Sequence, residues 1–169
     1  MQNMRGSPDH TVLGVLSDSH GQCTRVRRAV DLLRERGATV FLHLGDLGDG
    51  VLDELAGLNC HLVFGNCDDA RSLDGYARDI GMHVHHPGGV VEIDGRRIGI
   101  THGHLVEELE RLFLQRVEVI FHGHTHERSD AMVDGVRLGS ATVGSPAAVV
   151  NAVIDAISPF GVRHADMPL

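Results

Sequence analysis

The sequence predicts a layered α/β fold, an α/β/β/α sandwich in which two mixed β-sheets are flanked by helices. Three observations predict it. Apolar, strand-like runs alternate with helix-like segments in the first half of the chain, and strands dominate the second half. The length of 169 residues suits one domain. We therefore expect a single domain over residues 1–169, in which residues 1–10 are a flexible N-terminal lead.

A βαβ unit opens this domain. Residues 12–16 are a continuous apolar run, which is typical of a buried strand. An amphipathic helix follows, because apolar residues then recur at helical spacing: Val26, Ala29, Val30 and Leu33. The helix closes at Gly37, a residue that suits the left-handed cap, and residues 39–42 form the second strand.

The alternation of helix and strand continues further along the chain. A short helix near residues 51–57 leads to a strand at residues 61–64, and residues 70–80 are predicted to be helix or loop. A later helix over residues 105–115 precedes another strand at residues 117–121.

Hairpins are predicted where turn pairs separate apolar runs. Residues 90–93 and 97–101 flank the pair Asp94-Gly95, which favours a tight β-turn. A second such pair, Asp134-Gly135, and apolar alternation over residues 149–157 indicate that strands dominate the end of the chain.

Composition excludes several function classes. The formal net charge is −8, and all 15 basic residues are arginine, which disfavours an extended nucleic-acid surface. The five arginines of the first helix are interrupted by acids and indicate a solvated face. No apolar stretch is long enough to span a bilayer, so we expect a cytoplasmic protein without a membrane partner. Three cysteines without CxxC spacing predict reduced thiols.

Polar residues that can bind metals follow five of the predicted strands. Imidazole is the commonest metal ligand, and the chain has 13 histidines, five of them within one short stretch. The carboxyl ends of neighbouring parallel strands meet at one edge of a sheet, so these side chains are expected to converge. The candidate ligands are Asp18, His20, Asp46, Asn66, His102, His124 and His126.

These residues occur in five short motifs, in this order along residues 12–126: Asp18-Ser19-His20, Gly45-Asp46, Gly65-Asn66-Cys67-Asp68, His102-Gly103-His104 and Gly123-His124-Thr125-His126. Their joint presence resembles the calcineurin-like metallophosphoesterase superfamily. Length and the Asn-Cys-Asp variant resemble its small single-domain bacterial and archaeal phosphodiesterases.

The resemblance implies two divalent metal ions bridged by Asp46. One ion would take Asp18, His20, Asp46 and His126; the other would take Asp46, Asn66, His102 and His124. It further implies that Asn66 and His104 contact the substrate phosphate and that His104 and Asp68 are catalytic. Such mixed ligands suit Mn²⁺, our first choice, or Zn²⁺, Fe²⁺, Ni²⁺ or Co²⁺.

The implied function is hydrolysis of a small phosphodiester by a metal-bridging hydroxide. Alternatives are a phosphomonoesterase and a protein-interaction scaffold of the same fold, similar to a retromer subunit. A metallo-β-lactamase-like hydrolase is a weaker alternative, because His122-x-His124-x-His126 lacks that family's aspartate.

Two features depart from the family pattern. Cys67 stands where many relatives have a histidine that looks like the proton donor to the leaving group. We expect a buried thiol there, with protonation left to water or His104. After His126 the resemblance weakens, and residues 138–146 are expected to shape substrate access or a homo-oligomer contact.

The remaining histidines are predicted to be structural. His122 is expected to be packed or to support a ligand rather than to bind metal. The others have no motif match: His43, His61, His83, His85, His86 and His164.

Overall fold

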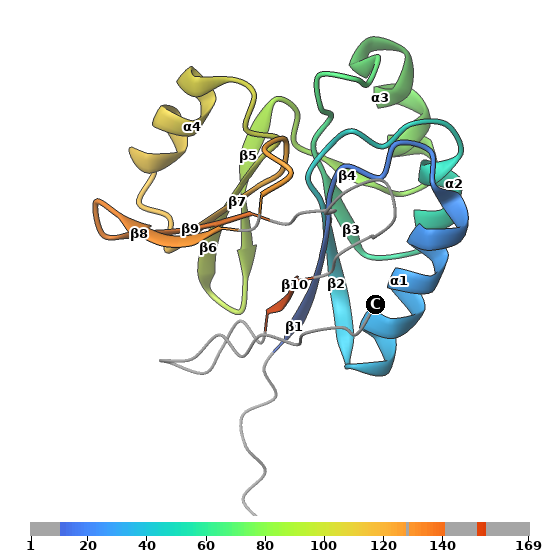
Figure 1. The fold of residues 1–169 in the computed structure, drawn as a ribbon, viewed down its shortest axis with the longest axis horizontal. Helices are drawn as coiled ribbons and strands as arrows, with labels where there is room; N and C mark the ends of the chain where they lie inside the picture. The colour runs from blue at the N-terminus through green and yellow to red at the C-terminus, as the bar shows by residue number, and fades with distance from the viewer. Residues whose placement is uncertain (1–10, 128, 141–151, 155–169) are drawn as a thin grey trace, which may run out of the picture.

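A computed structural model describes residues 11–127, 129–140 and 152–154. These residues form two five-stranded sheets, which lie between helices on both sides (Figure 1). The predicted α/β/β/α architecture is therefore confirmed.

The first sheet has the strand order β10-β1-β2-β3-β4. Strands β1 to β4 run parallel, as the βαβ pattern predicts, and β10 pairs antiparallel with β1. Its strands are β1 Val12–Leu16, β2 Ala38–His43, β3 Cys60–Leu62, β4 His83–Val84 and β10 Ala152–Ile154. The connecting helices are α1 Cys23–Glu35, α2 Val51–Leu55 and α3 Ala70–Asp79.

The second sheet has the order β5-β6-β7-β9-β8. Strands β6, β7 and β9 run parallel, while β5 and β8 pair antiparallel at the edges. Its strands are β5 Gly88–Ile93, β6 Arg96–Thr101, β7 Val119–His122, β8 Asp130–Val133 and β9 Val136–Ser140. Helix α4, Val106–Phe113, connects β6 and β7.

Both predicted hairpin turns are present. Asp94 and Gly95 have φ of 51° and 74°, and Asp134 and Gly135 have φ of 49° and 82°. Two consecutive left-handed residues match the twist of the flanking strands, which explains the Asp-Gly pairs.

The apolar core has three layers. Leu13, Leu42 and Ile100 belong to the layer between the two sheets, to which both sheets contribute. A second layer packs α1 to α3 against the first sheet, and a third lies under α4 on the second sheet. Figure 1 shows the two sheets side by side, with α1 to α3 on the outer side of the first and α4 on the outer side of the second.

Some predicted element boundaries are wrong. The strand predicted at residues 61–64 is Cys60–Leu62. Within the segment predicted at 149–157, the described residues Ala152–Ile154 are a strand, and the rest lies outside the described residues. Residues 1–10, and most of 138–146, lie outside the described residues, so the predictions made for them are not tested.

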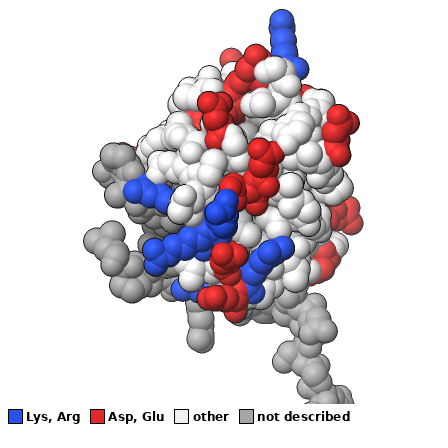
Figure 2. Space-filling model, turned by 90° about the vertical axis from the view of Figure 1, so that its right-hand side faces the viewer, with Lys and Arg blue, Asp and Glu red and all other residues white. Residues whose placement is uncertain are grey.

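The outer face of α1 carries mixed charges. Arg27 forms two hydrogen bonds with the carboxylate of Glu54 on α2, at 2.8 Å and 2.5 Å. Figure 2 shows basic and acidic groups side by side on this face, which fits the predicted solvated surface. Among the described residues, no helix has the length and apolar character that crossing a membrane requires.

Candidate metal centre

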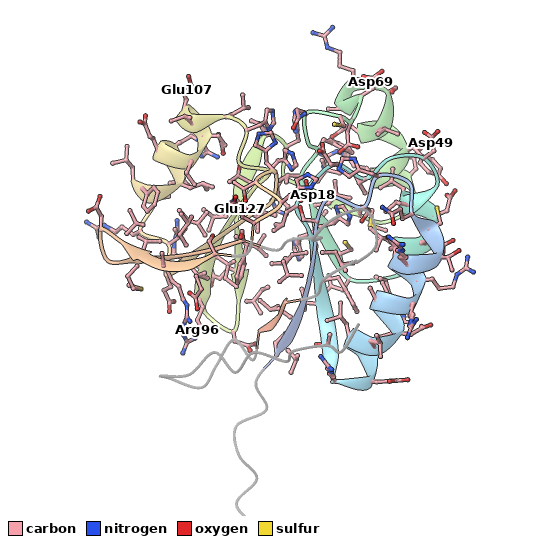
Figure 3. All side chains as sticks on the ribbon, in the orientation of Figure 1. Asp18, Asp49, Asp69, Arg96, Glu107 and Glu127 are labelled. Carbon is pink, nitrogen blue, oxygen red and sulfur yellow. The ribbon has the colours of Figure 1, made fainter. Side chains whose placement is uncertain are left out.

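The seven candidate ligands lie just beyond the carboxyl ends of parallel strands. The first sheet supplies four of them from the loops after β1, β2 and β3, and the second sheet supplies three from the loops after β6 and β7. Figure 3 shows Asp18 at this edge, between the two sheets. The predicted convergence therefore involves both sheets rather than one.

Five of the seven candidates have left-handed backbone conformations. This region is unfavourable for residues other than glycine, at roughly 1–2 kcal/mol each. It is held here by hydrogen bonds between loops, such as Asp18 N–H to the carbonyl of Gly45 at 2.9 Å. Such strain commonly persists where a site requires it. The φ values are 54° for Asp18, 43° for His20, 54° for Asp46, 69° for His124 and 53° for His126.

Asp18, His20 and His126 form the first ligand group. Each offers an atom within 4.8 Å of the other two. His126 Nε2 lies 3.4 Å from Asp18 Oδ1, and the rings of His20 and His126 stack with centroids 5.6 Å apart. These three residues are three of the four assigned to one ion by the family resemblance.

Asp46 lies between histidines from two loops. Its Oδ2 is 3.7 Å from His20 Nε2, and its Oδ1 is 3.5 Å from His102 Nε2. Burial opposes ionisation, but the hydrogen bond from the N–H of Cys67 and then the electrostatic influence of His102 outweigh it and hold the pKa of Asp46 below its usual value. A carboxylate with its two oxygens directed to different neighbours has the geometry that bridging requires.

His102 has the tautomer of a metal ligand. Its Nδ1 lies 2.7 Å from the carbonyl oxygen of Leu44, which only accepts, so Nδ1 carries the proton. The other nitrogen, Nε2, faces two oxygens that only accept, Asn66 Oδ1 at 3.1 Å and Asp46 Oδ1 at 3.5 Å. In the neutral ring Nε2 carries a lone pair as well, so a cation bound there would be shared by all three atoms. The ring of His124 stands edge-on to that of His102 at 5.2 Å. A backbone partner that fixes the tautomer in this way is usual for metal-binding histidines.

Glycines in the motifs leave room for these carboxylates. A Cβ on Gly65 would lie 2.1 Å from Asp46 Oδ1, and a Cβ on Gly123 would lie 2.7 Å from Asp18 Oδ2. Both distances are shorter than the non-bonded contacts that a Cβ makes. Glycine is therefore required in the Gly-Asn and Gly-His motifs, because the carboxylates approach the backbone too closely for a Cβ.

His104 lies beside the ligands with an unused nitrogen. Its Nδ1 is buried and has no hydrogen-bond partner among the described residues. Its ring is 5.3 Å from that of His102 and 6.1 Å from that of His124. Burial, then the neighbouring histidines, lowers its pKa, which favours the neutral ring. A buried nitrogen of this kind is available to a substrate.

The carboxylate of Asp68 accepts hydrogen bonds from backbone N–H groups rather than facing the candidate metal ligands. Its Oδ1 accepts from the N–H groups of Leu47 and Gly48 at 2.9 Å and 3.3 Å, and its Oδ2 accepts from Gly65 N–H at 2.9 Å. These bonds tie the loop after β2 to the loop after β3. They give Asp68 a positioning role, and its predicted catalytic role stays a prediction.

The expectation of a buried thiol at Cys67 is wrong. Cys67 is exposed, as is the neighbouring Asn66, and its backbone N–H donates to Asp46 Oδ1 at 2.9 Å. Partial desolvation and the nearby Asp46 carboxylate raise the pKa of the thiol. A neutral thiol beside a carboxylate is a poor proton donor at neutral pH.

His43 supports the site although no motif contains it. Gly45 N–H donates to His43 Nδ1 at 3.3 Å, so Nε2 carries the proton and donates to Ser19 Oγ at 2.8 Å. The ring therefore links the loops of Asp18 and Asp46. Complete burial lowers its pKa to about 4 and keeps it neutral. One sequence signal could have identified His43: it lies on the helix-facing side of a strand, just before the Gly-Asp motif.

His122 is packed as predicted. It is buried, and its Nδ1 lies 3.0 Å from the carbonyl of Gly123.

A family model described as the calcineurin-like phosphoesterase superfamily domain matches residues 12–154. The chain belongs to this superfamily. Phosphodiesterase MJ0936 of Methanocaldococcus jannaschii is 32% identical over 130 residues, which cover 73% of this chain and 78% of that protein. The resemblance predicted from the motifs is confirmed, and family membership makes the chain a hydrolase of phosphate esters.

Solved structures extend the comparison. An archaeal phosphodiesterase superimposes with a TM-score of 0.69 at 29% identity, over 78% of this chain and 84% of that one. A Vps29 from Entamoeba histolytica complexed with Zn²⁺ gives a TM-score of 0.55 at 23% identity, over 83% and 81% of the two chains. The second likeness shows the fold alone.

The residues at the strand ends fit the divalent metals on which the superfamily depends. Asp46 directs its two oxygens to different histidines, and His102 directs its Nε2 to the oxygens of Asp46 and Asn66. Imidazole, carboxylate and amide groups together form a donor set for first-row divalent ions.

Proposed function

We propose that this chain is a dinuclear-metal phosphodiesterase that hydrolyses a small phosphodiester. The position of Asp46 carries the proposal: its two carboxylate oxygens lie 3.7 Å and 3.5 Å from histidines of different loops. A phosphodiesterase relative at 32% identity supports the choice of a diester substrate.

The seven candidate ligands would hold the two ions in the sets that the family resemblance implies. Asp18, His20, Asp46 and His126 would hold one; Asp46, Asn66, His102 and His124 would hold the other. When bound, two divalent ions supply positive charge to the phosphate oxygens and activate the attacking water. We propose Mn²⁺ as the first choice.

The remaining residues would orient the substrate. His104 offers a neutral, half-buried ring whose Nδ1 has no partner among the described residues, and this nitrogen would donate to a phosphate oxygen. Asn66 would present its amide N–H to the same phosphate while its Oδ1 faces His102. Asp68 would keep the Asn66 loop in place through its backbone bonds.

The scaffold alternative predicts eroded ligands, as the fold can be kept without them. Here all seven positions carry residues that bind metals, and five have unfavourable backbone conformations. Phosphomonoester hydrolysis is the other alternative, and a substrate panel separates it from the proposal.

The test compares Asp46→Asn with Asp49→Asn. Both changes replace a carboxylate by an amide in the same loop, but Asp46 is buried and Asp49 is exposed. We expect Mn²⁺-dependent hydrolysis of bis-p-nitrophenyl phosphate to fall at least about 100-fold in Asp46→Asn, since the change removes a metal-binding charge. Asp49→Asn should keep the wild-type rate.

Equal rates in the wild type and Asp46→Asn would favour the scaffold. Faster turnover of simple monoesters than of cyclic or linear nucleotide diesters would favour the phosphomonoesterase.

A further inference from the structure

Three histidines form a separate cluster at the β3–β4 edge of the first sheet. His61 of β3 lies directly opposite His83 of β4 in the sheet register. Their rings stack with centroids 4.6 Å apart and an interplanar angle of 21°. His61 Nδ1 lies 2.9 Å from His85 Nε2. The three residues, called the edge cluster below, include none of the seven candidate ligands.

The edge cluster occupies the layer between the two sheets, where the neighbouring strands carry apolar residues. His61 is paired in register with Leu42, which belongs to the inter-sheet core. On the other side, a Cβ on Gly89 of β5 would lie 3.0 Å from the Cβ of His85. His61 and His85 are half-buried in this layer, and His83 is exposed at its rim. The cluster therefore closes the inter-sheet layer at this edge.

Two of the three side chains of the edge cluster, His61 and His85, are already placed for chelation. His83 and His85 are two residues apart, so they share a face of an extended segment, and His61 joins them from the adjacent strand. His61 Nδ1 and His85 Nε2 face each other at 2.9 Å, so one of them carries a proton and donates it in a hydrogen bond to the other. Two nitrogen ligands about 2.0–2.1 Å from one Zn²⁺ ion lie only slightly further apart than this. A cation can therefore replace the proton between them with little movement.

We propose that the edge cluster of His61, His83 and His85 binds a divalent transition-metal ion, separate from the centre at the strand ends. Three imidazole ligands select Zn²⁺, Ni²⁺, Cu²⁺ or Co²⁺ over Mn²⁺ or Mg²⁺, which prefer oxygen ligands. On binding, the proton between His61 and His85 moves to the other nitrogen of the ring that carried it, so both rings stay neutral.

His83 has to turn for this site to form. Its ring stacks on His61 in the structure, and rotation about its side-chain bonds brings one nitrogen toward the other two. Because the side chain is exposed, little packing opposes this rotation. Rotation of His83 would give the ion its third ligand and would break the stacking of His83 on His61.

The electrostatic surroundings keep the rings of His61 and His85 neutral, as ligands must be. Burial, and then His85 and His83, lowers the pKa of His61 to about 4. Burial lowers the pKa of His85, with smaller effects from His83 and Arg78. Arg78 donates to the carbonyl of Val84 at 3.3 Å, and its charge is paired with Asp74 at 3.0 Å.

The test is Zn²⁺ binding by equilibrium dialysis with metal analysis, for the wild type, His83→Ala and His86→Ala. His86 is the matched control: it follows the edge cluster directly, but its ring lies against Phe64 with centroids 5.6 Å apart. We expect the wild type and His86→Ala to bind one more Zn²⁺ per chain than His83→Ala, or to bind it at least about tenfold more tightly. Zn²⁺ should also shift the imidazole NMR signals of His61 and His85.

A second comparison separates this site from the strand-end centre. Asp46→Asn should keep the Zn²⁺ ion that His83→Ala loses, and Mn²⁺ stoichiometry should be equal in the wild type and His83→Ala. If His83→Ala binds as much Zn²⁺ as the wild type with equal affinity, the cluster is only a hydrogen-bonded packing feature. Unchanged imidazole signals of His61 and His85 with Zn²⁺ would overturn the proposal equally.

Discussion

Which ring nitrogen of each histidine carries a proton decides what the candidate centre can bind. His102 donates a hydrogen bond from Nδ1 to the carbonyl of Leu44 and directs Nε2 to Asp46 and Asn66. His43 has the opposite tautomer, because Gly45 N–H donates to its Nδ1. The two histidines thus have different roles: His102 directs Nε2 toward the candidate cation site, and His43 holds two loops together.

Cys67→His tests the missing proton donor at the residue scale. An imidazole in this exposed position beside Asp46 would protonate a leaving oxygen, a contribution typically of about 100-fold or more for poor leaving groups. We therefore expect faster hydrolysis of alkyl phosphodiesters and little change with p-nitrophenyl esters, which leave without a proton. Steady-state rates on both substrates measure this, with Cys67→Ser as the control. An unchanged ratio of the two rates would contradict the idea.

At the scale of elements, the loops after the strands are more constrained than the strands themselves. The loops of Asp18, Asp46 and His124 have left-handed residues, close glycine contacts and backbone bonds between loops. Asp68 accepts three backbone hydrogen bonds that tie the loop of Asp46 to the loop after β3. The site is therefore preorganised by short-range contacts at the sheet edge.

Two glycine substitutions separate loop constraint from helix propensity. Gly65→Ala places a methyl group 2.1 Å from Asp46 Oδ1, so we expect lower stability and weaker Mn²⁺ binding. Gly75→Ala, in α3, meets nothing within 4 Å and should stabilise the protein by about 0.5–1 kcal/mol. Urea unfolding and Mn²⁺ titration measure both effects. Equal behaviour of the two variants would show that Gly65 is not required by close approach.

Asp68→Asn distinguishes positioning from catalysis. The variant loses the charge that three backbone N–H groups share, and hydrogen bonds to charged groups contribute roughly 1.5–3 kcal/mol. For a positioning residue we expect lower stability and weaker Mn²⁺ binding, with kcat largely recovered at saturating Mn²⁺. A kcat that stays low in fully loaded, folded protein would instead assign Asp68 to the chemical step.

At the scale of the whole molecule, the centre exists only when the two sheets pack together. The first sheet carries Asp18, His20, Asp46 and Asn66, and the second carries His102, His124 and His126. The shared apolar layer of Leu13, Leu42 and Ile100 brings these groups to one place. Metal binding should therefore stabilise the packed sheets against unfolding, by linkage.

Stability should fall below neutral pH because buried histidines resist protonation. Burial lowers the pKa values of His43 and His61 to about 4, whereas the unfolded chain titrates near 6.5. Between these values the unfolded state binds more protons, so stability is lost as the pH falls from about 6.5 toward 4. The slope is at most about 1.4 kcal/mol per pH unit for each group.

Urea unfolding of the metal-free protein between pH 7.5 and pH 5, conditions chosen to be roughly on either side of the ordinary histidine pKa, measures this slope. His61→Asn should show a shallower loss than the wild type, and His86→Ala should match the wild type. A pH-independent midpoint would contradict the neutral buried histidines.

The sequence by itself determined the strand-and-helix order, the Asp-Gly hairpin turns and the family. These follow from local patterns: apolar periodicity, turn pairs with two left-handed residues, and motifs of fixed spacing such as Gly45-Asp46. The seven candidate ligands could be named because each directly follows a strand, where the chain direction alone predicts a shared edge.

Only the tertiary structure decided how the groups face one another. Which nitrogen of His102 is free, and which loops His43 links, depends on carbonyls and hydroxyls far away in sequence. The exposure of Cys67 and the meeting of His61 with His85 depend likewise on how loops and strands pack. Local periodicity fixes which side of an element a residue occupies, but ring orientation and contact between sheets arise from long-range packing.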